Sequence, residues 1–468
     1  MTTVDEGPEC GTRSAAVAAP VACAVGLGLV MFDNTALTVI LPTIAEERGI
    51  SEATARWVFV AFMLANLALL PAASGLAAVI GRRRCYQLGL AAFATGSLAI
   101  ALDGSFWLIL VGRLLQGAGG AMMLPNAAGL LQSNLAPSAR SRGVALWVTV
   151  SSIGIFLGPV AGGLLSETLT WRLVFVLEVA IALLGLALSR RLRDTEPPPG
   201  RRVDVGGMVL GGAGIGFACL VILEAGRSEP SVLLIIVGAV AAPILLTLFL
   251  FVERRVPEPA LDLAVFGTPG FRSLIIACLI YNAAVAGVGY VVSLSLQRDQ
   301  GLSASSAGWF VFATMALLPV GSQLAGRLAV RMGAGHLLAG AAAGLVIAFG
   351  LSAISFRIDL ALAVPTILAI GASVGLLFAG DTVATMELVE GDGLPSALTN
   401  LSLSRQVGSV VGVAVLGTVY QYAGRVVDPG PQALAAALGA AALAVLPAWW
   451  LLRTRVGPVM ARTRPVMP

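Results

Sequence analysis

A carboxylate stands deep inside a long apolar stretch near the start of the chain. Asp33 belongs to the stretch 17–42 and precedes Pro42 by nine residues, which puts it roughly 13 Å from that end of a helix. If the stretch spans a membrane, a charge at that depth costs several kcal/mol, so such residues usually face a cavity or a partner and exchange protons. Asp33 is therefore the first candidate for proton transfer. The alternative is a structural aspartate capped by Thr35 or Thr38.

An arginine stands inside another apolar stretch. Arg113 lies in 106–132 and is followed by Gln116 on the same stretch. Because a guanidinium does not lose its proton in proteins, Arg113 must pair with a carboxylate, with backbone carbonyls or with water. A structural clamp and a role in a proton relay both remain open.

Two further acids fall inside apolar stretches. Glu178 lies about two turns into 171–189, and Asp381 lies within 360–387. Both are candidates for contact with a proton or a substrate, since ionisable groups at membrane depth mark ion and substrate pathways. For Glu178 the alternative is a side chain that extends to the membrane interface, as long charged side chains do near helix ends.

The other residue types that support chemistry are scarce or scattered. His336 is the only histidine, so a serine–histidine catalytic pair is not expected. The five cysteines have no CxxC spacing, and no cluster of His, Cys and acidic residues suggests a metal. No Walker phosphate-binding loop occurs in the sequence. We therefore expect no enzymatic activity, no cofactor, no metal ion and no direct use of ATP.

The composition indicates a membrane protein. Of the 468 residues, 57% are hydrophobic and 12% charged, and the mean hydropathy is +0.92, whereas soluble domains carry about 25% charged residues. A water-soluble fold has too little interior to hide this much apolar surface. The 29 basic residues are all arginines in short, dispersed clusters, so no basic stripe is available for a nucleic acid.

Continuous apolar runs predict an all-α membrane protein, since a membrane-spanning helix needs about 20 apolar residues and a membrane strand would alternate polar and apolar positions. Fourteen transmembrane helices are expected, at approximately 17–42, 54–78, 85–103, 106–132, 143–166, 171–189, 205–224, 231–251, 271–296, 305–328, 335–355, 360–387, 396–422 and 431–452.

The arginines predict the orientation of these helices. Threading fourteen spans places twenty arginines on the side of both termini and seven on the opposite side. Because cytoplasmic loops carry the excess of basic residues, both termini are expected in the cytoplasm of a multi-pass protein of the cell membrane. One helix more or fewer would scramble this asymmetry.

Two groups of six apolar runs resemble each other. The loops before Gly81 and Gly333 share a Leu-Ala pair at the same distance from the glycine. Duplicated halves are typical of secondary transporters, which bind substrate between the halves near the membrane midplane. The predicted organisation is an N-terminal six-helix bundle (1–195), a linker with two extra helices (196–264) and a C-terminal six-helix bundle (265–468).

At these residues the chain resembles the major facilitator superfamily, in its branch of fourteen-helix drug:proton antiporters, over about residues 17–455. Signatures of that branch are matched in the first, fourth and fifth runs. The matching residues are Asp33, Thr35, Leu41 and Pro42, then Arg113, Gln116, Gly117 and Gly119, and finally the antiporter-signature residues Gly154, Gly158, Pro159, Gly162 and Gly163.

Two sites depart from the family pattern. In the loop after the second run, Gly81, Arg82 and Arg83 match, but Ala78 replaces the family's aspartate. The charge lock that the resemblance implies for this gating loop is therefore expected to be weakened. Glu178 replaces an asparagine of the family, and an extra buried acid there is consistent with a different substrate or a different proton site.

The resemblance implies proton-driven export of small amphipathic drugs or antibiotics by alternating access, that is, multidrug efflux by a monomer in the cell membrane. Asp33, Arg113, Glu178 and Asp381 would contact protons or substrate. Proton-coupled uptake of a small solute and a non-transporting membrane sensor remain the alternatives. The polar residues expected to line the cavity are Asn66, Gln116, Asn126, Tyr281, Asn282 and Tyr290.

The arginine asymmetry gives a test of topology. Reporter proteins fused to Met1 or to Pro468 should both give a cytoplasmic signal, because an even number of spans returns the chain to its starting side. Paired alkaline phosphatase and fluorescent-protein fusions measure this. An extracytoplasmic signal from either end would contradict the count of fourteen.

Overall fold

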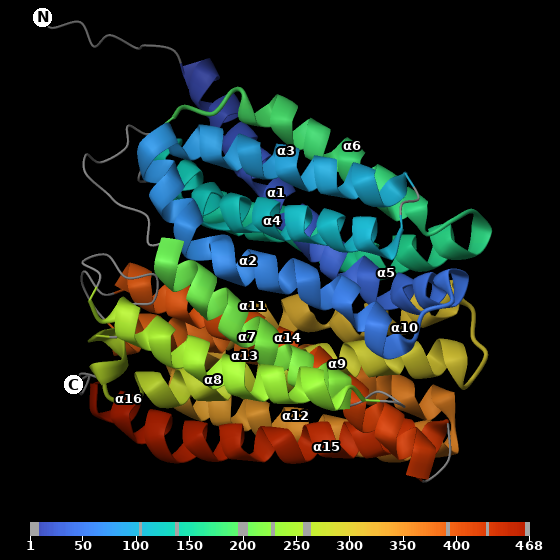
Figure 1. Cartoon of the computed structure of the whole chain (residues 1–468). Coiled ribbons are helices and arrows are strands. Elements are labelled where there is room, and N and C mark those ends of the chain that lie inside the picture. Colours follow the sequence, from blue (N-terminus) through green and yellow to red (C-terminus); the bar gives the residue numbers. More distant parts are fainter. Residues whose placement is uncertain are drawn as a thin grey trace, which may run out of the picture.

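The computed structural model describes residues 9–102, 105–135, 140–194, 205–225, 230–255, 264–389, 394–426 and 430–463. Within these ranges the chain forms helices and no strands (Figure 1), which confirms the all-α prediction for the described residues. The helices are α1 (Glu9–Arg48), α2 (Glu52–Ile80), α3 (Arg82–Ala101), α4 (Phe106–Ser133), α5 (Arg140–Thr168), α6 (Arg172–Ser189), α7 (Val205–Ala225), α8 (Val232–Glu253), η2 (Ala264–Gly267), α9 (Phe271–Arg298), α10 (Ala304–Ala316), α11 (Leu318–Met332), α12 (Ala334–Ile358), α13 (Leu360–Leu388), α14 (Leu394–Val426), α15 (Pro431–Leu451), η4 (Leu452–Val456) and α16 (Gly457–Thr463).

Among the described residues, 10 helical segments are long and apolar enough to cross a membrane. They lie in α1, α4, α6, α8, α9, α10 with α11, α12, α13, α14 and α15 with its continuation to Met460. Helices α5 and α7 carry shorter apolar stretches, Ile153–Thr168 and Val209–Ile222. A multi-span membrane protein is therefore supported, and the count of fourteen spans stays a prediction.

One expected helix is divided in two. The run predicted over 305–328 consists of α10 and α11, which are separated at Leu317. Pro319 follows at the start of α11, where its missing N–H is tolerated, while its ring would clash with the carbonyl four residues earlier in a continuous helix. The proline thus accounts for the break.

The helices pack in the same way twice. In the N-terminal half α1 lies against α5, α2 against α4, and α3 against both α4 and α6. In the C-terminal half α9 lies against α14, α11 against α13, and α12 against both α13 and α15. Figure 1 shows the two sets as the blue-to-green part from α1 to α6 and the yellow-to-red part from α9 to α15. The packing is thus duplicated among the described helices, and the division into 1–195, 196–264 and 265–468 stays a prediction.

The two additional helices lie outside these sets. Helix α8 packs on α7, and most of its side chains are exposed. Helix α7 contacts both α2 and α14, where Gly212 faces Ala68 and the Thr418 hydroxyl donates to the Ile222 carbonyl at 3.3 Å. Helix α7 therefore lies along the seam between the halves, with α8 at the periphery.

The halves are joined at one end of the bundle, which we call the Arg48 end because α1 terminates there. Gln297 of α9 donates to the Val39 carbonyl of α1 at 2.9 Å. The backbone N–H of Ser305 in α10 donates to Glu167 of α5 at 3.2 Å. These contacts lie towards the right of Figure 1, and they hold the two halves together at the Arg48 end.

A buried arginine also crosses the seam near this end. Arg56 of α2 is 0% exposed and donates to three groups of α14. Its acceptors are the Ala414 carbonyl at 3.2 Å, the Thr418 hydroxyl at 3.1 Å and the Gln421 side-chain oxygen at 2.9 Å. Because a guanidinium keeps its charge, this side chain depends on those acceptors when it is out of water.

Glycines permit the closest helix contacts in both halves. A Cβ on Gly154 would collide with the Gly28 carbonyl, and a Cβ on Gly158 with Thr35. In the other half Gly412 lies equally close to the Ala283 carbonyl. Small residues of this kind let membrane helices approach backbone to backbone, so the predicted glycine positions of the antiporter signature act in helix packing.

Alanine substitutions test this packing. Gly154→Ala and Gly412→Ala should each lower the free energy of unfolding by about 1–3 kcal/mol, because backbone atoms cannot move aside for the added methyl group. Gly350→Ala is the matched control, since no atom outside its own helix lies within 4 Å of a Cβ at Gly350. Thermal unfolding in detergent measures the difference, and equal midpoints for all three variants would contradict the packing argument.

Candidate functional site

The predicted acid and arginine of the N-terminal half form an ion pair. Asp33, in the middle of α1, faces Arg113 of α4. The two Arg113 Nη atoms donate to the two Asp33 carboxylate oxygens at 2.5 and 3.0 Å. A bidentate arrangement of this kind fixes both groups in one plane and is stronger than a single charged hydrogen bond. The alternative in which Thr35 or Thr38 caps the carboxylate is not observed, because their hydroxyls donate to backbone carbonyls of α1.

The Arg113 guanidinium has further partners around it. Its Nε donates to the Val58 carbonyl at 2.8 Å, and Nη1 also donates to the Gln116 side-chain oxygen at 2.7 Å. Its Cζ atom lies 4.7 Å from the centre of the Phe62 ring, within the range of a cation–π contact. Arg113 is thus surrounded by acceptors from α1, α2 and α4.

Gln116 connects this ion pair to the second predicted acid. Its Nε2 donates to Glu178 Oε2 at 2.8 Å and to Ser97 Oγ at 2.7 Å, and Ser97 Oγ also lies 2.9 Å from Glu178 Oε2. Asp33, Ser97, Arg113, Gln116 and Glu178 therefore form one network drawn from α1, α3, α4 and α6. We call these five residues the N-half cluster.

The N-half cluster is closed to solvent in this conformation. Asp33 is 1% exposed, and Ser97, Arg113, Gln116 and Glu178 are each 0% exposed. The alternative in which Glu178 extends to the membrane interface is therefore wrong. Its position on the inward face of α6, beside α3, explains why: the hydrogen bonds from Gln116 and Ser97 replace the water that the interface would supply.

A second cluster lies in the C-terminal half. Asp381 of α13 forms an ion pair with Arg405 of α14, whose Nη2 donates to Asp381 Oδ1. The Tyr281 hydroxyl of α9 donates to Asp381 Oδ2 at 2.5 Å, and the Cys278 thiol lies 3.5 Å from the same oxygen. We call Cys278, Tyr281, Asp381 and Arg405 the C-half cluster.

Arg405 is the functional candidate that the sequence analysis missed. Its guanidinium also donates to the Phe378 carbonyl at 2.8 Å and stacks 3.7 Å from the Phe378 ring. A signal for it existed, because Arg405 is a cation inside an apolar run, the criterion that selected Arg113. Ser97 had no comparable signal, since small polar residues are common throughout these runs.

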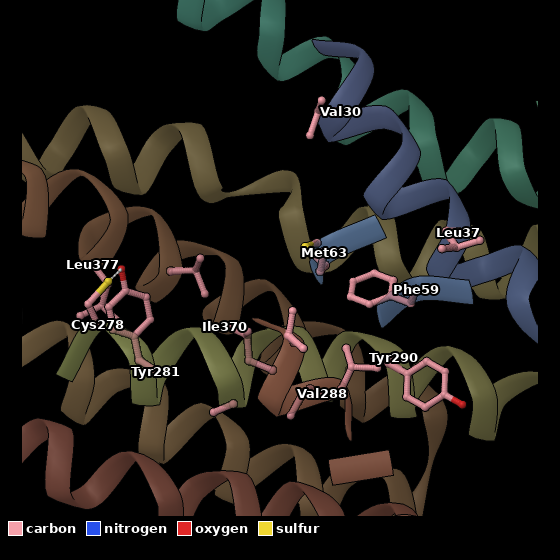
Figure 2. Packing of buried hydrophobic residues seen from close by; sticks show 14 of the residues in the cluster. Val30, Leu37, Phe59, Met63, Cys278, Tyr281, Val288, Tyr290, Ile370 and Leu377 are labelled. Atoms are coloured by element: carbon pink, nitrogen blue, oxygen red, sulfur yellow. Dashed lines mark hydrogen bonds between the residues drawn. The ribbon is translucent and has the colours of Figure 1, made fainter. Parts of the chain in front are cut away.

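The residues predicted to line a cavity lie in several places. Tyr281 belongs to the C-half cluster (Figure 2), and the Asn282 amide beside it donates to the Cys278 carbonyl at 2.9 Å. Asn66 and Asn126 are buried, at 1% and 3% exposure. Tyr290 lies further along α9 than Tyr281 and is buried at 2% exposure (Figure 2). In this conformation these polar groups do not converge on one site.

The gating loop is stabilised by a carboxylate from elsewhere in the chain. Gly81 has a φ of +92° and joins α2 to α3, a conformation that favours glycine. Asp194, just beyond α6, accepts from the Arg83 backbone N–H at 3.0 Å and lies at the start of α3, where a negative charge is favoured. The Arg82 guanidinium lies against Gly129. Asp194 thus supplies a carboxylate to the loop whose family aspartate is missing.

A comparison with known protein families identifies the superfamily of this chain. The chain matches the model of the Major Facilitator Superfamily over residues 23–388, and it belongs to this superfamily. The expected superfamily is therefore confirmed, its fourteen-helix drug:proton antiporter branch stays a prediction, and the match indicates a transporter rather than an enzyme.

Several relatives are named for drug or antibiotic export. The cephamycin export protein CmcT of Amycolatopsis lactamdurans is 31% identical over 485 residues, covering 99% of this chain and 98% of the relative. The multidrug efflux pump LfrA of Mycolicibacterium smegmatis is 30% identical, covering 90% of this chain and 84% of the relative. The methylenomycin A resistance protein of Bacillus subtilis is 29% identical, covering 87% and 88%.

Solved structures share the fold at low sequence identity. A bacterial homologue of the human lysosomal transporter Spinster, in an inward-facing and unoccupied conformation, has a TM-score of 0.68 at 16% identity and covers 99% of this chain and 100% of its own. The peptide transporter POT in complex with sulfate has a TM-score of 0.69 at 16% identity, with 95% of each chain covered. These similarities describe the fold alone.

The N-half cluster predicts a specific pattern of stability. Arg113→Met should lower the free energy of unfolding by about 3–5 kcal/mol, because the buried Asp33 carboxylate loses the guanidinium that donates to both of its oxygens. Adding Asp33→Asn and Glu178→Gln to that variant should restore most of the loss. Arg172→Met is the control, since its ion pair with Glu47 is partly exposed and contributes about 0–1 kcal/mol. Thermal unfolding would refute the pattern if the triple variant were no more stable than Arg113→Met.

Proposed function

We propose that the chain is a proton-coupled exporter of small amphipathic drugs or antibiotics that works by alternating access. One observation carries the proposal: a hydrogen-bonded cluster of two carboxylates and one guanidinium is buried between helices of an apolar bundle. Intramembrane ionisable groups of this kind mark ion and substrate pathways. The names of the relatives favour export of drugs over uptake of a nutrient or a non-transporting sensor.

In this proposal the N-half cluster carries the coupling proton. Asp33 would alternate between pairing with Arg113 and contacting a cationic substrate, and Asp33, Glu178 and Asp381 are the candidates for the coupling proton. The Asp33–Arg113 pair is closed in the present conformation, so its opening is the step that would admit substrate. Asn66, Gln116, Asn126, Tyr281, Asn282 and Tyr290 are proposed to reach the cavity when the halves rearrange.

The contacts between the halves bear on which end of the bundle faces outward. The contacts between α1 and α9, α5 and α10, and α2 and α14 join the halves at the Arg48 end. We propose that this is the outer end, that the loop of Gly81, Arg82 and Arg83 faces the cytoplasm with both termini, and that the chain works as a monomer with fourteen spans. Gly154, Gly158, Pro159, Gly162 and Gly163 would then hold the outer closure.

The energy for export would come from the proton gradient. Each elementary charge that moves across 100 mV is worth about 2.3 kcal/mol. One proton exchanged for one uncharged substrate therefore supports a concentration ratio of roughly fifty at that potential, since a tenfold ratio corresponds to about 1.4 kcal/mol. Exchange for a monovalent cation moves no net charge, so the pH difference alone drives it.

A susceptibility panel tests the proposal. Expression in a host that lacks its own efflux pumps should raise resistance to several amphipathic compounds, and an uncoupler should abolish their export. Asp33→Asn should remain folded but fail to export, because the amide keeps the size of the side chain but can neither carry the charge that pairs with Arg113 nor take up a proton. Glu46→Gln is the matched control, since Glu46 is an exposed carboxylate of the same helix.

One outcome would count against export, and another against the role of Asp33. No change in susceptibility or accumulation for any compound would remove the case for export. Full export by Asp33→Asn that an uncoupler still collapses would place the coupling proton on another group.

A further inference from the structure

The N-half cluster is not electrically balanced by its own side chains. It contains two carboxyl groups, Asp33 and Glu178, and one guanidinium, Arg113, all of them 0% or 1% exposed. With both acids ionised the cluster would hold one uncompensated negative charge out of water, which is expensive in an apolar interior. One proton makes the cluster neutral.

The hydrogen bonds distinguish the two acids. Both carboxylate oxygens of Asp33 accept charged N–H groups from Arg113. Glu178 accepts only from neutral donors, the Gln116 amide and the Ser97 hydroxyl, and both act on Oε2. Glu178 Oε1 is buried and has no hydrogen-bond partner. The ionised form is therefore stabilised far more at Asp33 than at Glu178.

The charged groups that face Glu178 are few among the described residues. They are Asp33 from α1 and Arg113 from α4, while α3 contributes the neutral Ser97. Since Arg113 is committed to Asp33 by two hydrogen bonds, no second cation is available to neutralise an ionised Glu178.

The C-terminal half shows that this charge is not required by the fold. Gly117 lies against the Phe62 carbonyl, and Gly371 lies against the Thr314 carbonyl in the duplicated position. Arg113 stands four residues before Gly117, and Ile367 stands four residues before Gly371. Arg113 and Ile367 therefore occupy corresponding positions in the two halves.

The same comparison applies to the rest of the cluster. Gln116 directly precedes Gly117, and Ile370 directly precedes Gly371, so these two residues also correspond. Gly158 lies against the Phe32 carbonyl, and Gly412 lies against the Ala283 carbonyl. Phe32 and Ala283 therefore occupy corresponding positions, and the residues that follow them, Asp33 and Ala284, correspond as well. Three apolar residues thus replace Asp33, Arg113 and Gln116 in the duplicated half, and helix packing does not need the cluster.

We propose that Glu178 is the residue on which the exchangeable proton of the N-half cluster rests, with Asp33 held ionised by Arg113. This inference rests on the proposed export function and assigns its proton site. When the cluster opens, the O–H bond of the Glu178 carboxyl group breaks and the proton passes to water. The remaining carboxylate accepts the charge of a cationic amphipathic substrate, and the cluster stays neutral through the exchange.

Infrared difference spectroscopy on the purified full-length chain tests the assignment without any substrate. At neutral pH the wild-type chain should show the carbonyl stretch of a protonated, buried carboxyl group. That band should shift when glutamate carries carbon-13 in its carboxyl group, should not shift with labelled aspartate, and should be absent from Glu178→Gln. Glu224→Gln, at another buried glutamate, is the matched control and should keep the band.

Three results would overturn the assignment. They are the absence of the band in the wild-type chain, a shift with labelled aspartate, and persistence of the band in Glu178→Gln. Asp33→Asn alone cannot decide between the acids, because it leaves Glu178 as the only carboxylate for Arg113 and should remove the band as well.

A transport measurement separates this inference from the proposed function. In proteoliposomes that export tetraphenylphosphonium, a proton gradient should accelerate export by the wild-type chain, and the ratio of rates with and without the gradient should fall to one in Glu178→Gln. Acceleration that persists in Glu178→Gln overturns the role of Glu178 while the exporter stands. No acceleration in the wild-type chain defeats proton coupling, and the infrared bands still report where the resting proton lies.

Discussion

The need to keep buried charge neutral governs the N-terminal half of this protein. A carboxylate or guanidinium taken out of water loses several kcal/mol of hydration, which only close partners and hydrogen bonds recover. Arg113 meets that need for Asp33 with two hydrogen bonds, while Gln116 carries the network on to Glu178. Four helices are thereby tied to one set of polar atoms. Any rearrangement of α1, α3, α4 or α6 must either preserve that set or supply water in its place.

The two halves use one framework for different purposes. Close glycine contacts recur at corresponding places, with Gly154 against Gly28 and Gly408 against Leu279. The polar residues do not recur in the same way. The C-half cluster joins Asp381 of α13 to Arg405 of α14, whereas the N-half cluster joins α1 to α4. Repetition thus determines how the helices pack, and the substitutions made within each half determine where charge is placed.

Sequence reasoning located the helices and most of the ionisable groups, because apolar length and a lone charge within it are local properties. It could not state which groups meet. The pairing of Asp33 with Arg113 depends on how α1 crosses α4, and the contribution of Asp194 to the gating loop depends on where the chain returns after α6. Ser97 illustrates the limit, since nothing in its surroundings along the chain sets it apart. Pro319 marks the break at Leu317 only once the structure is known, because Pro42 and Pro159 lie inside unbroken helices.

Arg56 bears on the rate at which the two halves could separate at the Arg48 end. Its guanidinium is held between α2 and α14 by the Ala414 carbonyl, the Thr418 hydroxyl and the Gln421 amide. Separating the halves at the Arg48 end must break these bonds together, since all three come from one helix. Water can rehydrate the cation only after the gap has widened enough to admit it, so the cost falls early in the motion. In the proposed cycle these bonds would stabilise the state in which the Arg48 end is closed, and breaking them before water arrives would add to the barrier to opening.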